Sequence, residues 1–192
     1  MTGVSVVYHS ASGHTRLMAE AVLEGAIRDG GAEGRIYALE GGQIVDGRWE
    51  DAAVLEALDA SDAIVFGCPT HMGSISTPMK AFMDATLQRF YSRAWADKVG
   101  AGFTVSATPS GDKLNTLVGL ALCAMQLGMI WVGQEQTTLN DRGLNRLGAY
   151  LGVAGQAEYG GPEPALFAGD RESGEVLGAR VAGIARALAA GR

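Results

Sequence analysis

The sequence contains few of the features that would indicate secretion, membrane insertion or nucleic-acid binding. Its only cysteines, Cys68 and Cys123, fit no disulfide framework, metal site or redox motif. No apolar run reaches the roughly 20 residues of a membrane helix, and the N-terminus lacks the basic and apolar segments of a signal peptide. The net charge is −6 without a cluster of lysine and arginine, so nucleic acid is not an expected partner. We therefore expect a cytoplasmic protein with two free thiols and no membrane insertion.

The composition is that of an ordinary folded protein. Hydrophobic residues make up 47% of the chain and charged residues 19%, which excludes a disordered chain. A length of 192 residues is sufficient for a substantial core, and the 28 glycines are scattered without an internal repeat or linker. We expect a single domain that comprises residues 1–192.

The most informative stretch lies at the N-terminus. An apolar strand pattern at residues 4–8 changes abruptly to a polar loop, and a helical pattern extends over residues 14–29. The first N–H groups of such a helix, with the hydroxyls of Ser10, Ser12 and Thr15, form an anion site. The same residue types also serve simply as helix caps, so both interpretations stay open at this point. The loop is neither a Walker A motif nor a dinucleotide fingerprint, because it has a single glycine and no Gly-Lys-Ser/Thr.

Strand and helix patterns alternate along the rest of the chain. Strands are predicted at residues 35–39, 63–66, 99–105 and 129–132, and helices at 51–60, 77–87, 113–127 and 172–190; residues 133–174 are predicted to be mostly irregular. This alternation is typical of an α/β fold, here a flavodoxin-like, doubly wound, five-stranded parallel sheet in the order 2-1-3-4-5 with helices on both faces. Polar loops at 9–15, 67–74 and 106–112 follow the first, third and fourth strands. Because the carboxyl ends of parallel strands share one edge, we expect these loops to converge.

Three segments of the chain resemble those of a known family. These are Tyr8-His9-Ser10-Ala11-Ser12-Gly13-His14-Thr15, Gly67-Cys68-Pro69-Thr70-His71-Met72-Gly73 and Met79-Lys80-Ala81-Phe82-Met83-Asp84. They are similar to segments of the WrbA-like NAD(P)H:quinone oxidoreductases, flavoproteins with the flavodoxin fold. The second segment, with the pattern G-x-P-T-x-x-G, is the most specific, and the likeness covers nearly the whole chain.

This resemblance implies a non-covalently bound FMN that carries the chemistry, with no catalytic side chain. The first loop would hold the phosphate through Ser10, Ser12, Gly13, His14 and Thr15. The second would contact the flavin ring through Pro69, Thr70, His71, Met72 and Gly73. The third would supply backbone N–H groups from the stretch Ser106, Ala107, Thr108, Pro109, Ser110 and Gly111. The aromatic residue that covers the flavin in the family corresponds to Phe90, and Tyr150 is a second candidate for the substrate-side wall.

The resemblance also implies a reaction and an assembly. NAD(P)H would deliver a hydride to FMN, and a quinone would then take two electrons at the same face. The protein would be a homotetramer or homodimer in which a neighbouring subunit forms part of the pocket wall. The chain departs from the family at Ser12, where an aromatic residue is usual, at Gln126-Leu127, where a histidine pair is usual, and in the lower glycine content of its third loop. These departures concern nucleotide preference and quinone reduction.

Three other interpretations remain open. The chain could be a flavodoxin-type carrier that passes single electrons between protein partners, although its modest charge and its long excursion at 133–174 favour an enzyme. A flavin-free binding protein is opposed by the first loop. A metal site formed by His9, His14 and His71 lacks the carboxylate or thiolate ligands of a zinc site, Cys68 apart, so we expect no metal.

Overall fold

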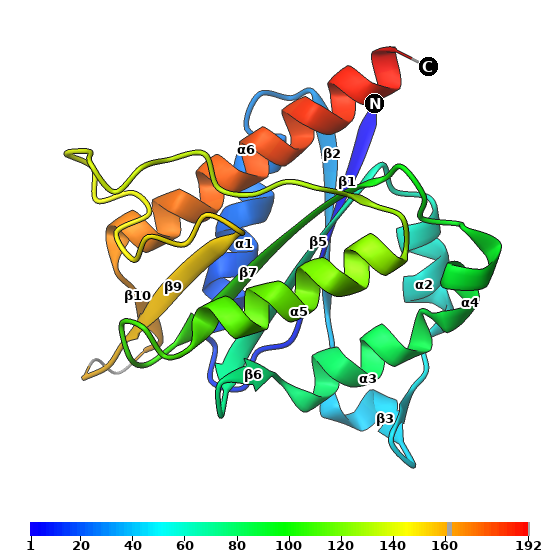
Figure 1. Ribbon diagram of the computed structural model, residues 1–192, viewed down its shortest axis with the longest axis horizontal. Coiled ribbons are helices and arrows are strands. Elements are labelled where there is room, and N and C mark those ends of the chain that lie inside the picture. The colour runs from blue at the N-terminus through cyan, green and yellow to red at the C-terminus, as the bar shows by residue number, and fades with distance from the viewer. Residues whose placement is uncertain (161–162, 192) are drawn as a thin grey trace.

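The computed structural model describes residues 1–160 and 163–191, which form a central, largely parallel sheet between two layers of helices (Figure 1). The principal strands are β1 (Thr2–Tyr8), β2 (Ala32–Ala38), β5 (Ala63–His71), β7 (Val99–Ser106) and β9 (Val153–Glu158). They lie in the order β2-β1-β5-β7-β9, and each is parallel to its neighbours. The flavodoxin-like α/β fold is confirmed, and this strand order is consistent with the predicted 2-1-3-4-5.

Several short elements extend this framework. β3 (Ile44–Val45) and β4 (Arg48–Trp49) form a separate hairpin after a 3₁₀ turn, η1 (Gly41–Gln43). β6 (Ser74–Ile75) is antiparallel to the end of β5, and β10 (Ala165–Leu166) is antiparallel to β9. β8 (Ile130–Trp131) lies parallel to the beginning of β7. In the parts of the chain that the structure describes, no helix is both long and apolar enough to span a membrane.

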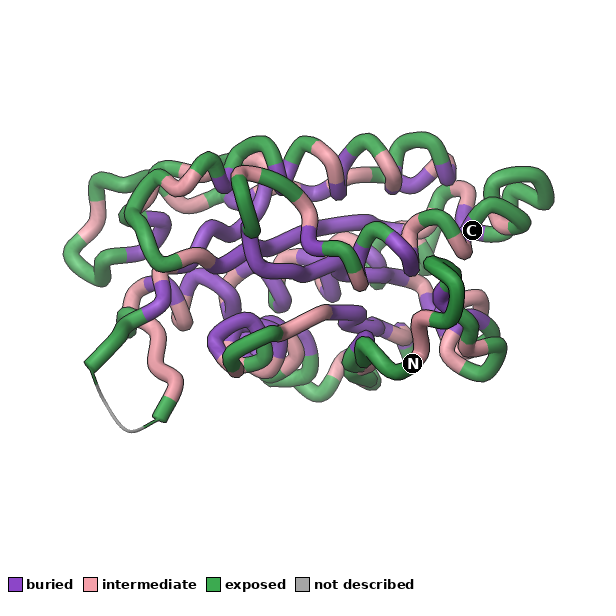
Figure 2. The backbone as a smooth tube through the Cα atoms, turned by 90° about the horizontal axis from the view of Figure 1, so that it is seen from below, coloured by how far each residue is buried: buried purple, intermediate pink, exposed green. Residues whose placement is uncertain are grey.

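Helices cover both faces of the sheet and enclose two hydrophobic clusters. α1 (His14–Ile27) and α6 (Ala168–Ala190) pack on one face, and α2 (Ala52–Asp59), α3 (Thr77–Ala85), α4 (Leu87–Ser92) and α5 (Lys113–Gln126) on the other. Strand residues alternate between the clusters: Val6 contributes to the first and Val7 to the second. Figure 2 shows the buried strands between outer layers that are largely exposed. The sheet is therefore buried on both faces, which explains its continuous apolar runs.

α1 and α6 approach each other at glycine residues. A Cβ atom at Gly25 would lie 1.8 Å from the carbonyl oxygen of Glu175, and one at Gly178 would lie 1.9 Å from that of Val22. No side chain fits at such distances. The two helices therefore pack backbone to backbone, with the second half of α1 against the first half of α6.

The predicted fifth strand is only one part of the strand observed at this edge of the sheet. The predicted strand at 129–132 is the two-residue β8, whereas β9 lies in the segment predicted to be irregular. β8 pairs with Val99 and Gly100, and β9 pairs with residues 103–106 on the same edge of β7. A single strand position is thus interrupted by a long excursion.

The second polar loop is more regular than predicted. β5 continues through residues 67–71 because it remains paired with β7 as far as Val105. The chain then reverses at Met72 and Gly73, whose φ angles of 48° and 75° are those of a two-residue type I′ hairpin turn. The residues of the G-x-P-T-x-x-G segment are therefore held by the sheet.

Candidate functional site

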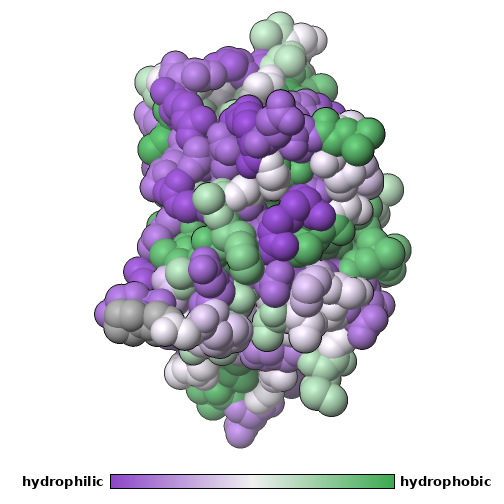
Figure 3. Space-filling view, turned by 90° about the vertical axis from the view of Figure 1, so that its left-hand side faces the viewer, coloured by the Kyte–Doolittle hydropathy of each residue, from purple (hydrophilic) through white to green (hydrophobic). Residues whose placement is uncertain are grey.

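The three predicted loops converge on one cavity at the carboxyl edge of the sheet. The cavity has a volume of about 180 Å³. It is lined by residues of all three segments and by the end of β9: Ala11, Ser12, His14, Thr15, Pro69, Thr70, His71, Val105, Ser106, Ala107, Ala157 and Tyr159. Figure 3 views the molecule from this side, where hydrophobic residues form a band beneath a mostly hydrophilic region. The convergence expected from the strand order is therefore present.

The first loop has the donor arrangement of an anion site. The Ser10 Oγ accepts hydrogen bonds from the backbone N–H groups of Gly13 (3.1 Å) and Arg16 (3.2 Å). Two N–H groups at the beginning of α1 thus converge on one oxygen atom, which is what an oxygen of a phosphate group requires. Gly13 has a φ of 88°, and a Cβ atom there would lie 2.7 Å from the Pro164 Cγ. The residues present fit a phosphate bound through backbone donors.

His14 links the first loop to the end of β9. Its Nδ1 lies 3.0 Å from the Ser12 Oγ, and its Nε2 lies 3.4 Å from the carbonyl oxygen of Glu158. Its ring is 5.1 Å from the ring of Tyr159, and its side chain is buried. Within residues 1–160 and 163–191, no group of three or more His, Cys, Asp and Glu side chains could hold a metal ion. His14 therefore connects the first loop to the end of β9 through hydrogen bonds of its two ring nitrogens.

The second segment rests on buried threonine side chains. The Thr70 Oγ1 lies 2.8 Å from the Oγ1 atoms of both Thr104 and Thr116. The Thr104 hydroxyl also donates to the carbonyl oxygen of Cys68 at 2.7 Å. This network fixes the floor of the cavity beneath Pro69. Burial raises the pKa of the Cys68 thiol to about 11, so the thiol stays protonated and inert at neutral pH.

Two histidines lie beside the second segment. The His9 Nδ1 is 2.9 Å from the Oγ of Ser76, and the ring of His9 is 6.5 Å from that of His71. Partial burial lowers the pKa of His9, and the proximity of His71 lowers it further. His9 is therefore neutral at pH 7, whereas His71 is exposed at the cavity mouth.

The third loop is fixed from behind by two side chains. Lys113, at the first position of α5, donates through its Nζ to the carbonyl oxygens of Thr108 and Pro109. The Gln156 Nε2 donates to the carbonyl oxygen of Ala107 at 3.1 Å. Lys113 is only 3% exposed, and burial lowers its pKa to about 8. Three successive carbonyl groups of the loop are thus oriented toward the protein.

Two predicted substrate-side residues lie elsewhere. Phe90 is on α4, packs against Tyr91 with a ring distance of 5.4 Å, and lines a groove of about 390 Å³ between α3, α4 and α5. Tyr150 is exposed in the excursion, where its carbonyl oxygen accepts from the N–H of Gln134. Neither residue lines the cavity of this chain. Tyr159 does line it, but nothing in the sequence indicated this because β9 was not recognised.

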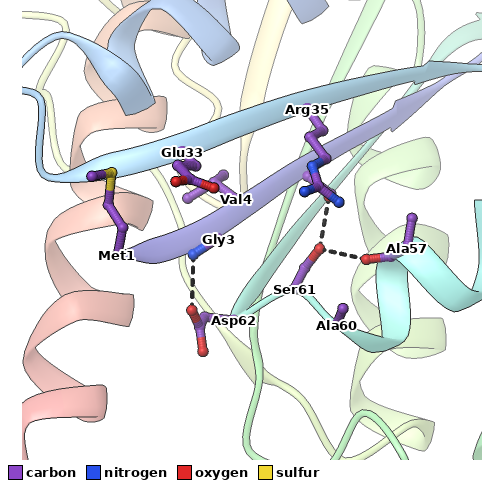
Figure 4. Close-up of a pocket in the computed structure, with 10 residues that line it drawn as sticks. Met1, Gly3, Val4, Glu33, Arg35, Ala57, Ala60, Ser61 and Asp62 are labelled. Carbon is purple, nitrogen blue, oxygen red and sulfur yellow. Dashed lines mark hydrogen bonds between the residues drawn. The ribbon is translucent and has the colours of Figure 1, made fainter.

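A second cavity, of about 150 Å³, lies at the opposite, amino-terminal edge of the sheet (Figure 4). Its polar groups bond mainly to one another. The N–H of Gly3 donates to Asp62 Oδ2 at 2.8 Å, and the Ser61 Oγ donates to the Ala57 carbonyl oxygen at 3.0 Å and lies 2.7 Å from the Ser5 Oγ. These contacts join β1 to the beginning of β5, which indicates a structural role.

Comparison with known proteins gives consistent matches over most of the chain. The family model described as NADPH-dependent FMN reductase matches residues 4–141. Flavodoxin FldP from Pseudomonas aeruginosa is 36% identical over 98% of this chain and 99% of its own. An NAD(P)H dehydrogenase (quinone) from Archaeoglobus fulgidus is 34% identical over 98% of this chain and 100% of its own. The solved structure of a WrbA-like flavodoxin from Agrobacterium tumefaciens is 40% identical, with a TM-score of 0.76, over 97% and 99% of the two chains.

Proposed function

Because the chain belongs to the NADPH-dependent FMN reductase family, we propose that its three loops hold FMN, with the phosphate in the first loop and the ring against the other two. The chain is a flavin-dependent oxidoreductase with FMN as its cofactor and NAD(P)H as its electron donor. The resemblance to WrbA-like flavoproteins is confirmed.

The donor geometry of the first loop carries the placement of the phosphate. The N–H groups of Gly13 and Arg16 converge on the Ser10 hydroxyl, and rotation of that side chain makes both donors available to an anionic oxygen. Thr15 is buried in the first turn of α1 and lines the cavity between the three loops. Ser10, Gly13 and Arg16 line a separate hollow on the β2 side of the loop. No lysine or arginine precedes Arg16, so backbone donors and the helix dipole provide most of the binding.

The second and third loops are suited to a flat ring. The Thr70 hydroxyl is fixed by those of Thr104 and Thr116, and Pro69 pairs with Val105 in the sheet. The hairpin tip at Met72 beside them is fully exposed. FMN, when bound, supplies the hydride and electron chemistry. The protein positions the ring, keeps the nicotinamide face accessible, and directs amide donors to the ring edge.

We propose a quinone as the acceptor. NAD(P)H releases one hydride, that is, two electrons and a proton, and a quinone takes up two electrons and two protons, the second of which comes from solvent. Relatives from Archaeoglobus fulgidus and Aromatoleum aromaticum carry the name NAD(P)H dehydrogenase (quinone). The alternative is a single-electron carrier, which is favoured by the relative named flavodoxin FldP.

An anaerobic experiment separates the two functions. FMN-loaded protein is mixed with NADH or NADPH while the flavin absorbance is followed, and benzoquinone is then added. If the protein is a quinone oxidoreductase, at least one nucleotide bleaches the flavin absorbance within seconds, and the absorbance recovers when the quinone is added. Failure of both nucleotides to bleach the flavin, with accumulation of a one-electron-reduced form on stepwise chemical reduction, would identify a carrier.

We also propose that the protein is a homodimer or homotetramer that uses the outer face of α5. The residues Leu114, Val118, Leu122 and Met125 lie at helical spacing on this helix and are exposed. The only charged residue of α5, Lys113, is buried. In a two-fold symmetric dimer the same face of each subunit meets its own copy, so charges on that face would repel one another. Because the chain has a net charge of −6, an uncharged face is the favoured contact.

The assembly is tested by a charge on this face. Leu122→Lys is expected to convert the oligomer to a monomer in size-exclusion chromatography with light scattering. Leu139→Lys is the matched control, because Leu139 is exposed in the excursion, away from α5, and this variant keeps the wild-type mass. A wild-type protein that is already monomeric at micromolar concentration would contradict the proposal.

A further inference from the structure

Lys113 is a buried charged residue whose position opposes two general preferences. It is only 3% exposed, and burying a charged side chain is unfavourable unless the charge is compensated. It is also the first residue of α5, where the positive end of the helix dipole repels a cation. Both effects disfavour the ammonium group. Burial is the main cause of the lowered pKa of Lys113, and the charge of Arg146 lowers this pKa further. A residue that is unfavourable in two respects suggests a functional reason.

The contacts of Lys113 leave most of its charge without a counter-charge. Its Nζ donates to two neutral carbonyl oxygens, those of Thr108 and Pro109. Asp170 is the acidic group that acts on it electrostatically, but the Asp170 Oδ2 already accepts from Arg146 Nη2 and from the N–H of Gln156, both at 2.8 Å. Among the described residues, Asp170 forms its ion pair with Arg146, and the nearby Glu175 pairs with Arg28 and Arg171. Lys113 takes part in none of these ion pairs.

The same contacts set the orientation of the third loop. In a trans peptide the N–H group points opposite to the C=O group. The carbonyl groups of Ala107 and Pro109 point to Gln156 and Lys113, so the N–H groups of Thr108 and Ser110 point to the other side of the loop. Pro109 has no N–H group. Ser106 and Ala107, immediately before this stretch, line the cavity.

We propose that Lys113 is a positioning residue that makes the site prefer reduced over oxidised FMN, a proposal that rests on the placement of the flavin ring against the third loop. Its hydrogen bond to the Pro109 carbonyl oxygen directs the N–H group of Ser110 toward the ring edge, as Gln156 does for the N–H group of Thr108. Its positive charge lies one peptide group behind that edge, in a region of low dielectric where charge interactions are strong. Reduction adds negative charge to the ring edge, and the ammonium group stabilises that charge.

The test compares the binding of the two forms of FMN in Lys113→Met. The affinity for oxidised FMN is measured by quenching of flavin fluorescence, and the midpoint potential by photochemical reduction beside a reference dye, without any nucleotide. We expect the affinity for oxidised FMN to stay within about threefold of wild type. We expect the preference for reduced FMN to fall about tenfold, which lowers the two-electron potential by about 30 mV.

Three further variants make the result specific. Lys113→Arg keeps the charge and is expected to restore the wild-type preference. Lys113→Gln keeps a donor without a charge, and it replaces Lys113→Met if that variant does not fold. Lys80→Met, on the exposed side of α3 where Lys80 pairs with Asp84, is the control and leaves the potential unchanged.

The outcomes distinguish this proposal from the function on which it rests. Equal weakening of oxidised and reduced FMN in Lys113→Met would mean that Lys113 only supports the loop, and the proposal would be overturned. The same potential shift in Lys80→Met would overturn it as well. If the wild-type protein binds no FMN, the placement of the cofactor itself fails. If it binds FMN but is not reduced by NAD(P)H, the Lys113 test still gives its answer.

Discussion

Replacing Gly13 by alanine tests the phosphate site most directly. Gly13 has a φ of 88°, and a residue with a Cβ atom in this left-handed region costs about 1–2 kcal/mol. The new Cβ atom would also lie 2.7 Å from the Cγ and 3.2 Å from the Cβ of Pro164. One of the two segments must therefore move, and the N–H of residue 13 is among the converging donors. We expect FMN binding to weaken by at least tenfold, equivalent to about 1.4 kcal/mol.

A second glycine provides the matched control for backbone strain. Gly30 has a φ of 66° and nothing within 4 Å of the position of its Cβ atom. Gly30→Ala therefore carries the left-handed strain without a clash and without a role in the first loop. Urea denaturation in the absence of FMN measures the strain, and fluorescence titration measures the affinity. Gly30→Ala is expected to lose about 1–2 kcal/mol of stability. Gly13→Ala should lose at least as much because of its additional contact with Pro164, and only Gly13→Ala should lose affinity. Wild-type affinity in Gly13→Ala, or an equal loss in Gly30→Ala, would refute the reasoning.

Three further predictions concern single groups of the site. Thr15→Ala removes a buried hydroxyl at the cavity and should weaken FMN in a fluorescence titration while the melting curve of the apoprotein stays close to wild type; unchanged affinity would exclude a role for the hydroxyl. Thr104→Val leaves the Cys68 carbonyl oxygen without its donor and should lower the free energy of unfolding by about 1–3 kcal/mol in urea; a neutral result would mean that water replaces the hydroxyl. The pKa of His9 is lowered from 6.5 in the folded protein, so the unfolded chain binds the proton first and stability should decline as the pH falls below about 6.5. His9→Asn should reduce the dependence of the urea midpoint on pH between pH 5 and 7.5. The same dependence in the wild type and the variant would mean that another group causes the decline in stability.

The sequence predicts the strands correctly where burial produces a local run of apolar residues. The apolar runs at 4–8, 63–66 and 99–105 are strands that helices cover on both faces, and such strands are recognisable from their composition. Because the strand order fixes which loops meet, the three-loop site followed from it. All three loops line one cavity, as this strand order predicts.

The sequence does not predict elements whose conformation or position depends on tertiary contacts. The segment Val153–Glu158 contains small residues and only one β-branched residue. Gly155 has no side chain because Met18 packs against it: a Cβ atom there would lie 2.7 Å from the Met18 Cε. Its strand conformation comes from the free edge of β7. Likewise, the hydroxyls of Thr70, Thr104 and Thr116 come from three elements, and no spacing in the sequence links them.

The interrupted fifth strand makes residues 133–151 an insertion into a single strand position of the sheet. Gly100 pairs with Trp131 and Phe103 with Val153, so two positions of β7 lie between the halves. Val132 donates its N–H to the carbonyl oxygen of Gly100, and Gly152 packs directly against Gly102. Residues 132 and 152 therefore fill these positions, and a peptide bond between them would produce a continuous strand. Residues 133–151 are therefore an insertion into one strand position, and the Asn145–Ser173 hydrogen bond and the Arg146–Asp170 ion pair anchor it to α6. The insertion can change in length at the cost of loop closure while the sheet keeps its register, provided that these anchors are kept.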